Sequence, residues 1–469
     1  MYFCKQIKKI RIMKSLRELY KIGIGPSSSH TMGPHKAAKI FAARHQDARA
    51  FEVTLYGSLA ATGKGHMTDV AIINVLKTVA PTTIVWQPTT FLPFHPNGMV
   101  FKAINSEGKA DEEWTVYSIG GGALSEGKAE GDEFSTPEVY PLGTLSEIME
   151  WCNDNGRKYW EYVNECEDSS IWDYLKEVWE TMKQAVERGI NTEGRLPGPL
   201  NLARKAPTYY VKASGYKQSL QSRGLVYAYA LAVSEENASG GTIVTAPTCG
   251  ACGVMPAVLY HSWKAHDMSE TRVLHALATG GLIGNIVKQN ASISGADVGC
   301  QGEVGVACAM ASAAACQMFG GSPSQIEYAA EMGLEHHLGM TCDPICGLVQ
   351  IPCIERNAFA ATRALDANLY AAFSDGMHRV TLGGAGNEAD RPRHPLIVQG
   401  NKCRRTGQKL LQHHQDKTIG NRAKKRRYLH RPTKVSSTVN EGTFNSRRRY
   451  LHQKGVFDCH YFISILPCR

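Results

Sequence analysis

The chain has 469 residues, of which 43% are hydrophobic and 20% charged, a composition typical of a folded protein with two or three domains. No apolar run approaches the roughly 20 residues needed to cross a bilayer, and the N-terminus lacks a secretory signal, so we expect neither a membrane nor a secreted protein. The formal net charge of +9 is concentrated at one end: residues 383–469 hold 19 Lys and Arg against five Asp and Glu, whereas the rest holds 33 against 38.

The first predicted domain, residues 14–155, mixes helices and strands. Residues 1–13 are a basic extension, because Met13 would be a natural alternative start. Pro34 stands in the favoured first turn of a predicted helix that ends at Arg44. Alternating apolar residues predict strands over 51–57, 99–105 and 114–119. The fold class expected for the whole chain is therefore α+β, with this mixed domain followed by helices.

Residues 156–205 are predicted to be a helical linker region. Ile171, Leu175 and Val178 recur at three- and four-residue steps, and the turn-rich GRLPGPL follows them at 194–200. Residues 206–382 should then form a mostly α-helical domain, with helices at 223–234, 253–265, 271–288, 302–318, 323–338 and 355–373.

The sequence changes character after Leu382. Residues 383–469 lose apolar periodicity and gain repeated Arg, His and Gln, so they bury too little apolar surface to offset the entropy of ordering. We expect this basic tail to be disordered, and a frameshift near residue 383 would explain it. Its AKKRRYLHRP stretch lacks the fold context of nucleic-acid recognition, so we do not expect nucleic-acid binding.

Three cysteines, Cys300, Cys342 and Cys353, are the strongest candidates for a metal site. Cys342 precedes Asp-Pro and Cys353 follows Ile-Pro, which are turn positions from which thiols can converge. Three thiolates suffice for three irons of a cubane cluster and leave the fourth iron open as a Lewis acid. The alternative is that all three are buried cysteines of a small-residue core. Cys346 is an uncertain addition to this set.

Other cysteines fit a metal site less well. Cys249 and Cys252 form a CxxC, but zinc would need a second pair and a redox pair would need a strand-to-helix setting, so we interpret both as structural. Cys308 and Cys316 follow Cys300 at eight-residue steps in a predicted helix. Each step turns about 80° around the axis, so the three thiols cannot face one metal.

Two polar motifs precede or follow predicted helices. Hydroxyls and an imidazole gather before a helix start, where a carboxylate could bind, although a capping loop is the alternative. These residues are Ser27, Ser28, Ser29, His30 and Thr31. His66, in GKGH, titrates near neutrality and is the candidate for proton transfer, although a lone histidine is more often structural.

These motifs resemble the iron–sulfur-dependent L-serine dehydratases. GPSSSHTMGPHKAA (25–38) and YGSLAATGKGH (56–66) are similar to the family's beta region, and residues 217–382 resemble its alpha region. The resemblance implies a [4Fe-4S] cluster on Cys300, Cys342 and Cys353, with a histidine matching His66 nearby. It further implies an L-serine ammonia-lyase (EC 4.3.1.17) of L-serine catabolism, acting in the cytoplasm as a homodimer and releasing pyruvate and ammonia.

Two rival functions stay open. A pyridoxal-phosphate serine dehydratase would perform the same net reaction, but the Schiff-base lysine and phosphate-binding glycine loop that it needs are not recognisable. A catalytically impaired cluster-binding or regulatory homologue is the alternative favoured by the altered C-terminus. Iron content without turnover would distinguish this homologue from the enzyme.

Overall fold

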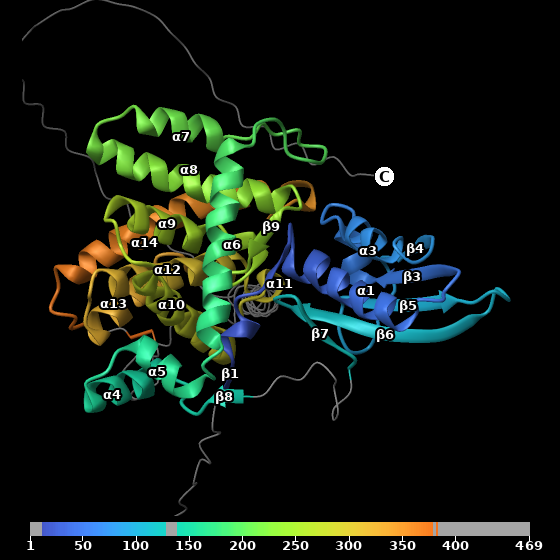
Figure 1. Ribbon diagram of the computed structural model, residues 1–469, viewed down its shortest axis with the longest axis horizontal. Coiled ribbons are helices and arrows are strands. Elements are labelled where there is room, and N and C mark those ends of the chain that lie inside the picture. Colours follow the sequence, from blue (N-terminus) through green and yellow to red (C-terminus); the bar gives the residue numbers. More distant parts are fainter. Residues whose placement is uncertain (1–11, 128–137, 379–380, 383–469) are drawn as a thin grey trace, which may run out of the picture. The chain divides into compact units, whose positions relative to one another are not determined.

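The computed structural model describes residues 12–127, 138–378 and 381–382. Their architecture is α+β, which confirms the predicted class, and it contains two hydrophobic cores. Figure 1 shows a strand-rich part with helices α1 and α3 and a second part built from helices α4 to α14. The predictions for residues 383–469 and for most of the N-terminal extension lie outside the described residues. Within the described part, no helix is long and apolar enough to span a bilayer.

The smaller core lies against a five-stranded sheet of order β4-β3-β5-β6-β7, in which β3 and β4 are parallel and the other neighbours antiparallel. Phe51, Val53 and Leu55 alternate along β3 and are buried, as the strand pattern predicts. Three strands were predicted from alternation; the short β4 and β7 were not. The bounds are β3 Ala50–Tyr56, β4 Thr82–Gln87, β5 Gly98–Ile104, β6 Ala110–Gly120 and β7 Ala123–Ser125.

Helices α1 (Gly33–Arg44) and α3 (Thr68–Leu76) contribute to the same core as the sheet. Pro34 occupies the first turn of α1, as predicted. The short helix α2 (Gly57–Thr62) follows β3 directly. Residues 63–67 connect α2 to α3, so the GKGH motif lies in a tight turn between two helices.

The first described segment joins the larger, helical core although it precedes the sheet in sequence. Leu16 and Tyr20 are fully buried, and the Tyr20 hydroxyl donates to the Leu277 carbonyl at 3.0 Å. Two short antiparallel pairs fix this segment, and the domain limits at 155 and 205 remain predictions. The pairs are β1 (Met13–Lys14) with β8 (Glu138–Tyr140) and β2 (Ile22–Ile24) with β9 (Thr242–Val244).

The centre of the helical core is close-packed through small residues. A Cβ atom at Gly280 would lie 2.8 Å from the Met310 carbonyl oxygen, so α10 and α12 approach closely only because glycine stands there. The helices are α4 Leu145–Asn155, α5 Tyr159–Cys166, α6 Ile171–Asn191, α7 Ala206–Ser214, α8 Gln218–Ala238, α9 Val254–Ala265, α10 Glu270–Asn290, α11 Gly295–Val298, α12 Val306–Met318, α13 Pro323–Glu335 and α14 Cys353–Ala372.

All six helices predicted beyond residue 206 are confirmed, with ends that shift by a few residues. The helix predicted at 302–318 begins differently: Gln301–Gly305 form a π-helical turn, and the α-helix α12 begins only at Val306. Wider turns of this kind often occur at functional sites. This turn directly follows Cys300.

Candidate functional site

Cys300 and Cys342 come together because two loops approach closely. Gly299 has a φ of +79°, and a Cβ atom there would lie 2.7 Å from the Met340 carbonyl oxygen. The amide of Gln301 donates to that same oxygen at 3.1 Å. The two Sγ atoms and a Glu303 carboxylate oxygen consequently all lie within 4.8 Å of one another.

Cys353 is the first residue of α14, where the helix dipole favours a thiolate. Asn357 fixes this turn: its side-chain oxygen accepts from the Gly253 amide at 2.9 Å, and its Nδ2 donates to the Gly250 carbonyl at 2.8 Å. Burial, chiefly, raises the pKa of Cys353 to about 12, and the charge of Cys300 acts in the same direction. The third thiol is therefore near the other two, outside the group of atoms within 4.8 Å.

The thiols of Cys300 and Cys342 interact, since both belong to the group of atoms within 4.8 Å of one another. Their interaction lowers the pKa of Cys300, with Arg356 assisting, and raises the pKa of Cys342. Cys300 is only 2% exposed and Cys342 is partly exposed. Soft sulfur donors from three separate segments in one buried place are the donor set that iron–sulfur clusters use. The residues present therefore fit such a cluster.

The remaining cysteines of this region occupy other environments. Cys346 is exposed in a turn with a φ of +55°. Cys249 and Cys252 are fully buried, and burial raises the pKa of both thiols, as expected of structural residues. Cys308 is buried within α12 and donates to the Ala360 carbonyl at 3.4 Å.

The two polar motifs of the N-terminal region meet at a pair of histidines. The rings of His30 and His66 have centroids 4.7 Å apart. The Thr31 hydroxyl donates to the His66 carbonyl at 2.7 Å, and the Thr68 hydroxyl donates to the His30 carbonyl at 2.6 Å. These reciprocal bonds hold the 27–31 turn against the loop that carries His66.

Hydrogen bonds define the state of each imidazole. His66 Nδ1 lies 3.0 Å from the Thr62 carbonyl oxygen, which can only accept, so Nδ1 carries the proton and Nε2 is the basic nitrogen. Burial lowers the pKa of His66. His30 contacts the hydroxyls of Ser29 at 2.9 Å and Ser58 at 3.1 Å, and burial lowers its pKa to about 3. Both rings are neutral near pH 7.

Some of the hydroxyl side chains of residues 27–31 form hydrogen bonds within their own turn. Ser27 caps the π-helical turn Ser28–Met32 by accepting from the His30 amide at 3.2 Å, and Ser28 is buried. The Thr31 hydroxyl also accepts from the Ser27 amide at 3.1 Å. The turn is thus a capping loop and, at the same time, the support of the histidine pair.

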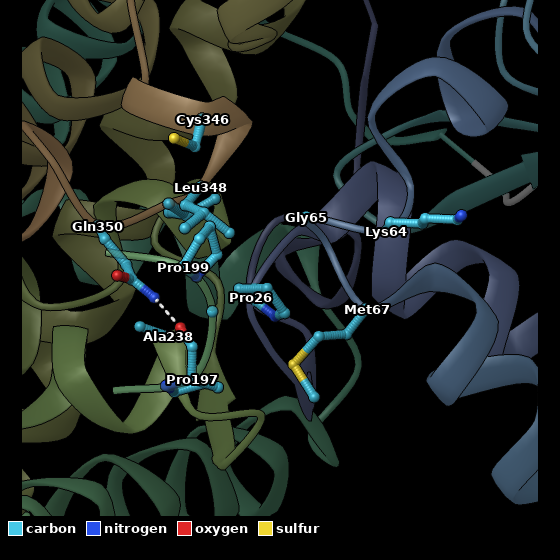
Figure 2. A pocket seen from close by; sticks show the side chains of 12 residues that line it. Pro26, Lys64, Gly65, Met67, Pro197, Pro199, Ala238, Cys346, Leu348 and Gln350 are labelled. Carbon is cyan, nitrogen blue, oxygen red and sulfur yellow. Dashed lines mark hydrogen bonds between the residues drawn. The ribbon is translucent and has the colours of Figure 1, made fainter. Parts of the chain in front are cut away.

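A pocket of about 330 Å³ lies where the GKGH loop faces the loop between the second and third cysteines. A Cβ atom at Gly65 would lie 3.4 Å from the Cys346 carbonyl oxygen. Figure 2 shows Gln350 across the pocket from Met67. The Nε2 of Gln350 donates to the Pro197 carbonyl at 2.7 Å. The predicted linker at 194–200 therefore forms a wall of this pocket, which its turn composition did not indicate.

Sequence reasoning missed one residue of the thiol site, Glu303. Its carboxylate accepts from the Thr248 hydroxyl at 2.9 Å, and burial raises its pKa. The available signal was the single acid of the stretch GCQGEVGVAC, which begins at Gly299 and, apart from Gln301, otherwise holds only small and apolar residues.

Comparison with known proteins identifies the family of the chain. The serine dehydratase alpha chain family matches residues 73–385, and the serine dehydratase beta chain family matches residues 15–87. The L-serine dehydratase of Haemophilus influenzae is 40% identical over 425 residues, covering 79% of this chain and 93% of that protein. L-serine dehydratase 1 of Escherichia coli is 40% identical over 424 residues, with the same coverage, and the L-serine dehydratase of Helicobacter pylori is 34% identical over 423 residues, covering 78% and 92%. The chain belongs to the serine dehydratase family.

Proposed function

We propose that this chain is an L-serine ammonia-lyase that converts L-serine to pyruvate and ammonia, with a [4Fe-4S] cluster held by Cys300, Cys342 and Cys353. The observation that carries the proposal is the approach of Cys300 and Cys342 from separate loops, in a chain whose relatives are named L-serine dehydratases. When bound, the cluster supplies a Lewis-acidic iron that turns the substrate hydroxyl into a better leaving group.

His66 is the proposed base. Its Nε2 is unprotonated near neutrality because Nδ1 donates to the Thr62 carbonyl and burial lowers the pKa of the ring. Nε2 takes the Cα proton of L-serine while the Cβ–O bond breaks, so one water is lost and aminoacrylate forms. Aminoacrylate tautomerises to an imine, and one water then hydrolyses the imine to pyruvate and ammonia.

The turn of Ser27, Ser28, Ser29, His30 and Thr31 is proposed to bind the substrate carboxylate. It lies directly before α1, where helix amides and the positive end of the dipole favour an anion. The hydrogen bond from Thr31 to the His66 carbonyl would couple a bound carboxylate to the base.

Pyruvate release from L-serine by anaerobically prepared protein, supplied with iron and sulfide, tests this function. We expect turnover that is lost in air and abolished by Cys342→Ala. Turnover that depends on pyridoxal phosphate and not on iron would favour the rival cofactor. An iron-loaded protein without turnover would favour a cluster-binding homologue, the second candidate, which is motivated by a family match that ends at residue 385.

Two further properties are proposed from the family resemblance alone. The first is a homodimer, which light scattering of the purified protein would test. The second is a cytoplasmic location, which fractionation of expressing cells would test.

A further inference from the structure

Glu303 is an acid with a side-chain oxygen beside the two adjoining thiols. It follows Cys300 by three residues, on the π-helical turn Gln301–Gly305, and its oxygen belongs to the group of atoms within 4.8 Å. Asp343, which follows Cys342, is exposed and its carboxylate accepts from the Thr341 hydroxyl. Of these two acids, only Glu303 has a carboxylate oxygen in that group.

The surroundings of Glu303 are shaped around its carboxylate. A Cβ atom at Gly295 would lie 2.3 Å from Oε2, and one at Gly250 would lie 3.3 Å from Oε1. Oε1 also accepts from the Thr248 hydroxyl at 2.9 Å. The two glycines leave space for the carboxylate, and the Thr248 hydroxyl fixes its orientation. The carboxylate therefore has a defined position and does not rotate freely.

This carboxylate has no cation of its own. Among the described residues, no ammonium, guanidinium or imidazole nitrogen lies within 4.0 Å of it. The nearby Arg356 acts on its charge, but Arg356 Nη1 donates to the Thr341 carbonyl at 2.9 Å. A mostly buried carboxylate without an ion pair is costly, and a cationic ligand would remove that cost.

We propose that Glu303 binds the α-ammonium group of the substrate and so selects 2-amino acids over 2-hydroxy acids. This inference rests on the proposed function. In that function the hydroxyl of L-serine goes to the cluster and its carboxylate to the 27–31 turn. The ammonium group is the third polar group of L-serine and needs an acceptor beside the thiols.

The test compares binding of L-alanine and L-lactate, which differ only in an ammonium or a hydroxyl group at Cα and carry no β-hydroxyl to lose. Calorimetric titration of the cluster-loaded protein gives both dissociation constants without turnover. We expect the wild type to bind L-alanine more tightly than L-lactate. Glu303→Gln should raise the dissociation constant of L-alanine at least tenfold and change that of L-lactate by no more than about twofold. The KM for L-serine should rise in parallel.

Controls separate recognition from damage. Iron and sulfide content of Glu303→Gln should equal that of the wild type, and Glu331→Gln, a buried acid on α13, should keep the preference. Thr248→Val, which removes only the hydroxyl that orients the carboxylate, should reduce the preference to a lesser degree. An unchanged preference in Glu303→Gln, or loss of iron from it, would overturn the proposal. A wild type that prefers L-alanine to L-lactate but releases no pyruvate would contradict the proposed function alone, and the effect of Glu303→Gln on L-alanine binding would still decide whether Glu303 recognises the ammonium group.

Discussion

The imidazole rings of His30 and His66 lie 4.7 Å apart between centroids, with their planes inclined by 35°. Thirty-six positions of sequence separate them, yet the His66 carbonyl accepts a hydrogen bond from the Thr31 hydroxyl, and the His30 carbonyl accepts one from the Thr68 hydroxyl. The pair therefore places a half-buried, neutral His30 behind the proposed base and fixes the loop that carries it.

Replacing the base should affect turnover and not the cluster. We expect His66→Asn to lower kcat by roughly 10²- to 10⁴-fold, because that is what a positioned general base contributes. Stopped assays of pyruvate, together with iron content, measure both effects. His35→Asn on α1 is the control; a kcat of His66→Asn within threefold of the wild type would rule out His66 as the base.

The acid sensitivity of the fold should depend on His30. Its pKa is about 3 in the folded protein against an ordinary 6.5. Below pH 6.5 the imidazole therefore takes up a proton in the unfolded chain while it stays neutral in the folded protein. The free energy of unfolding should then fall by about 1 kcal/mol per pH unit as the pH decreases from 6.5 towards 4. Chemical denaturation of the wild type and His30→Gln at several pH values measures this. Equal slopes in the two proteins would show that His30 contributes nothing.

Gly299 should be intolerant of a side chain. A Cβ atom at this position, with a φ of +79°, meets the Met340 carbonyl at 2.7 Å, so Gly299→Ala combines backbone strain with a steric conflict. We expect a loss of at least ~2 kcal/mol of unfolding free energy and reduced iron retention. Gly320→Ala, with a φ of +85° and open space around it, should lose about 1 kcal/mol and keep its iron. Iron retention in Gly299→Ala equal to this control would refute the role given to the close approach.

A buried ion pair should stabilise the junction before α7. Arg204 Nη1 lies 2.9 Å from Glu236 Oε1, and the two side chains are 7% and 9% exposed. Glu236 keeps a second partner, Arg188, whose Nε lies 3.1 Å from Oε2, so Arg204→Met removes one of two cations and should cost about 2 kcal/mol in denaturant unfolding. The exposed pair of Arg223 and Asp366 supplies the comparison: Arg223→Met should cost no more than about 1 kcal/mol. Similar losses from the two substitutions would contradict this assignment.

Periodic sequence features predicted the fold well. The alternation of Phe51, Val53 and Leu55 and the proline in the first turn of α1 are local signals, and the elements they predict are present. The pairing of β2 with β9 joins residues more than 200 positions apart through three-residue strands. Segments so short carry no readable period, so only tertiary packing specifies them.

The candidate site was predictable where chemistry marks single residues. The turn residues beside Cys342 predicted a thiol outside a helix interior, and Cys342 lies next to Cys300. His66 was marked by its imidazole, and it meets the 27–31 turn. Glu303 was not found, because a helical pattern places it on a continuous α-helix. The π-helical turn, which no residue pattern announces, changes the direction of side chains over 301–305.

The most direct test of the central claim is the rate of pyruvate release from L-serine as a function of iron bound per chain. Anaerobic reconstitution with increasing iron and sulfide would give a series of partly loaded samples, with a Cys300→Ala, Cys342→Ala, Cys353→Ala triple variant as the control. We expect a rate that rises with bound iron, reaches its maximum at about four irons per chain and is absent in the triple variant. Pyruvate release that is independent of iron, or that persists in the triple variant, would contradict it.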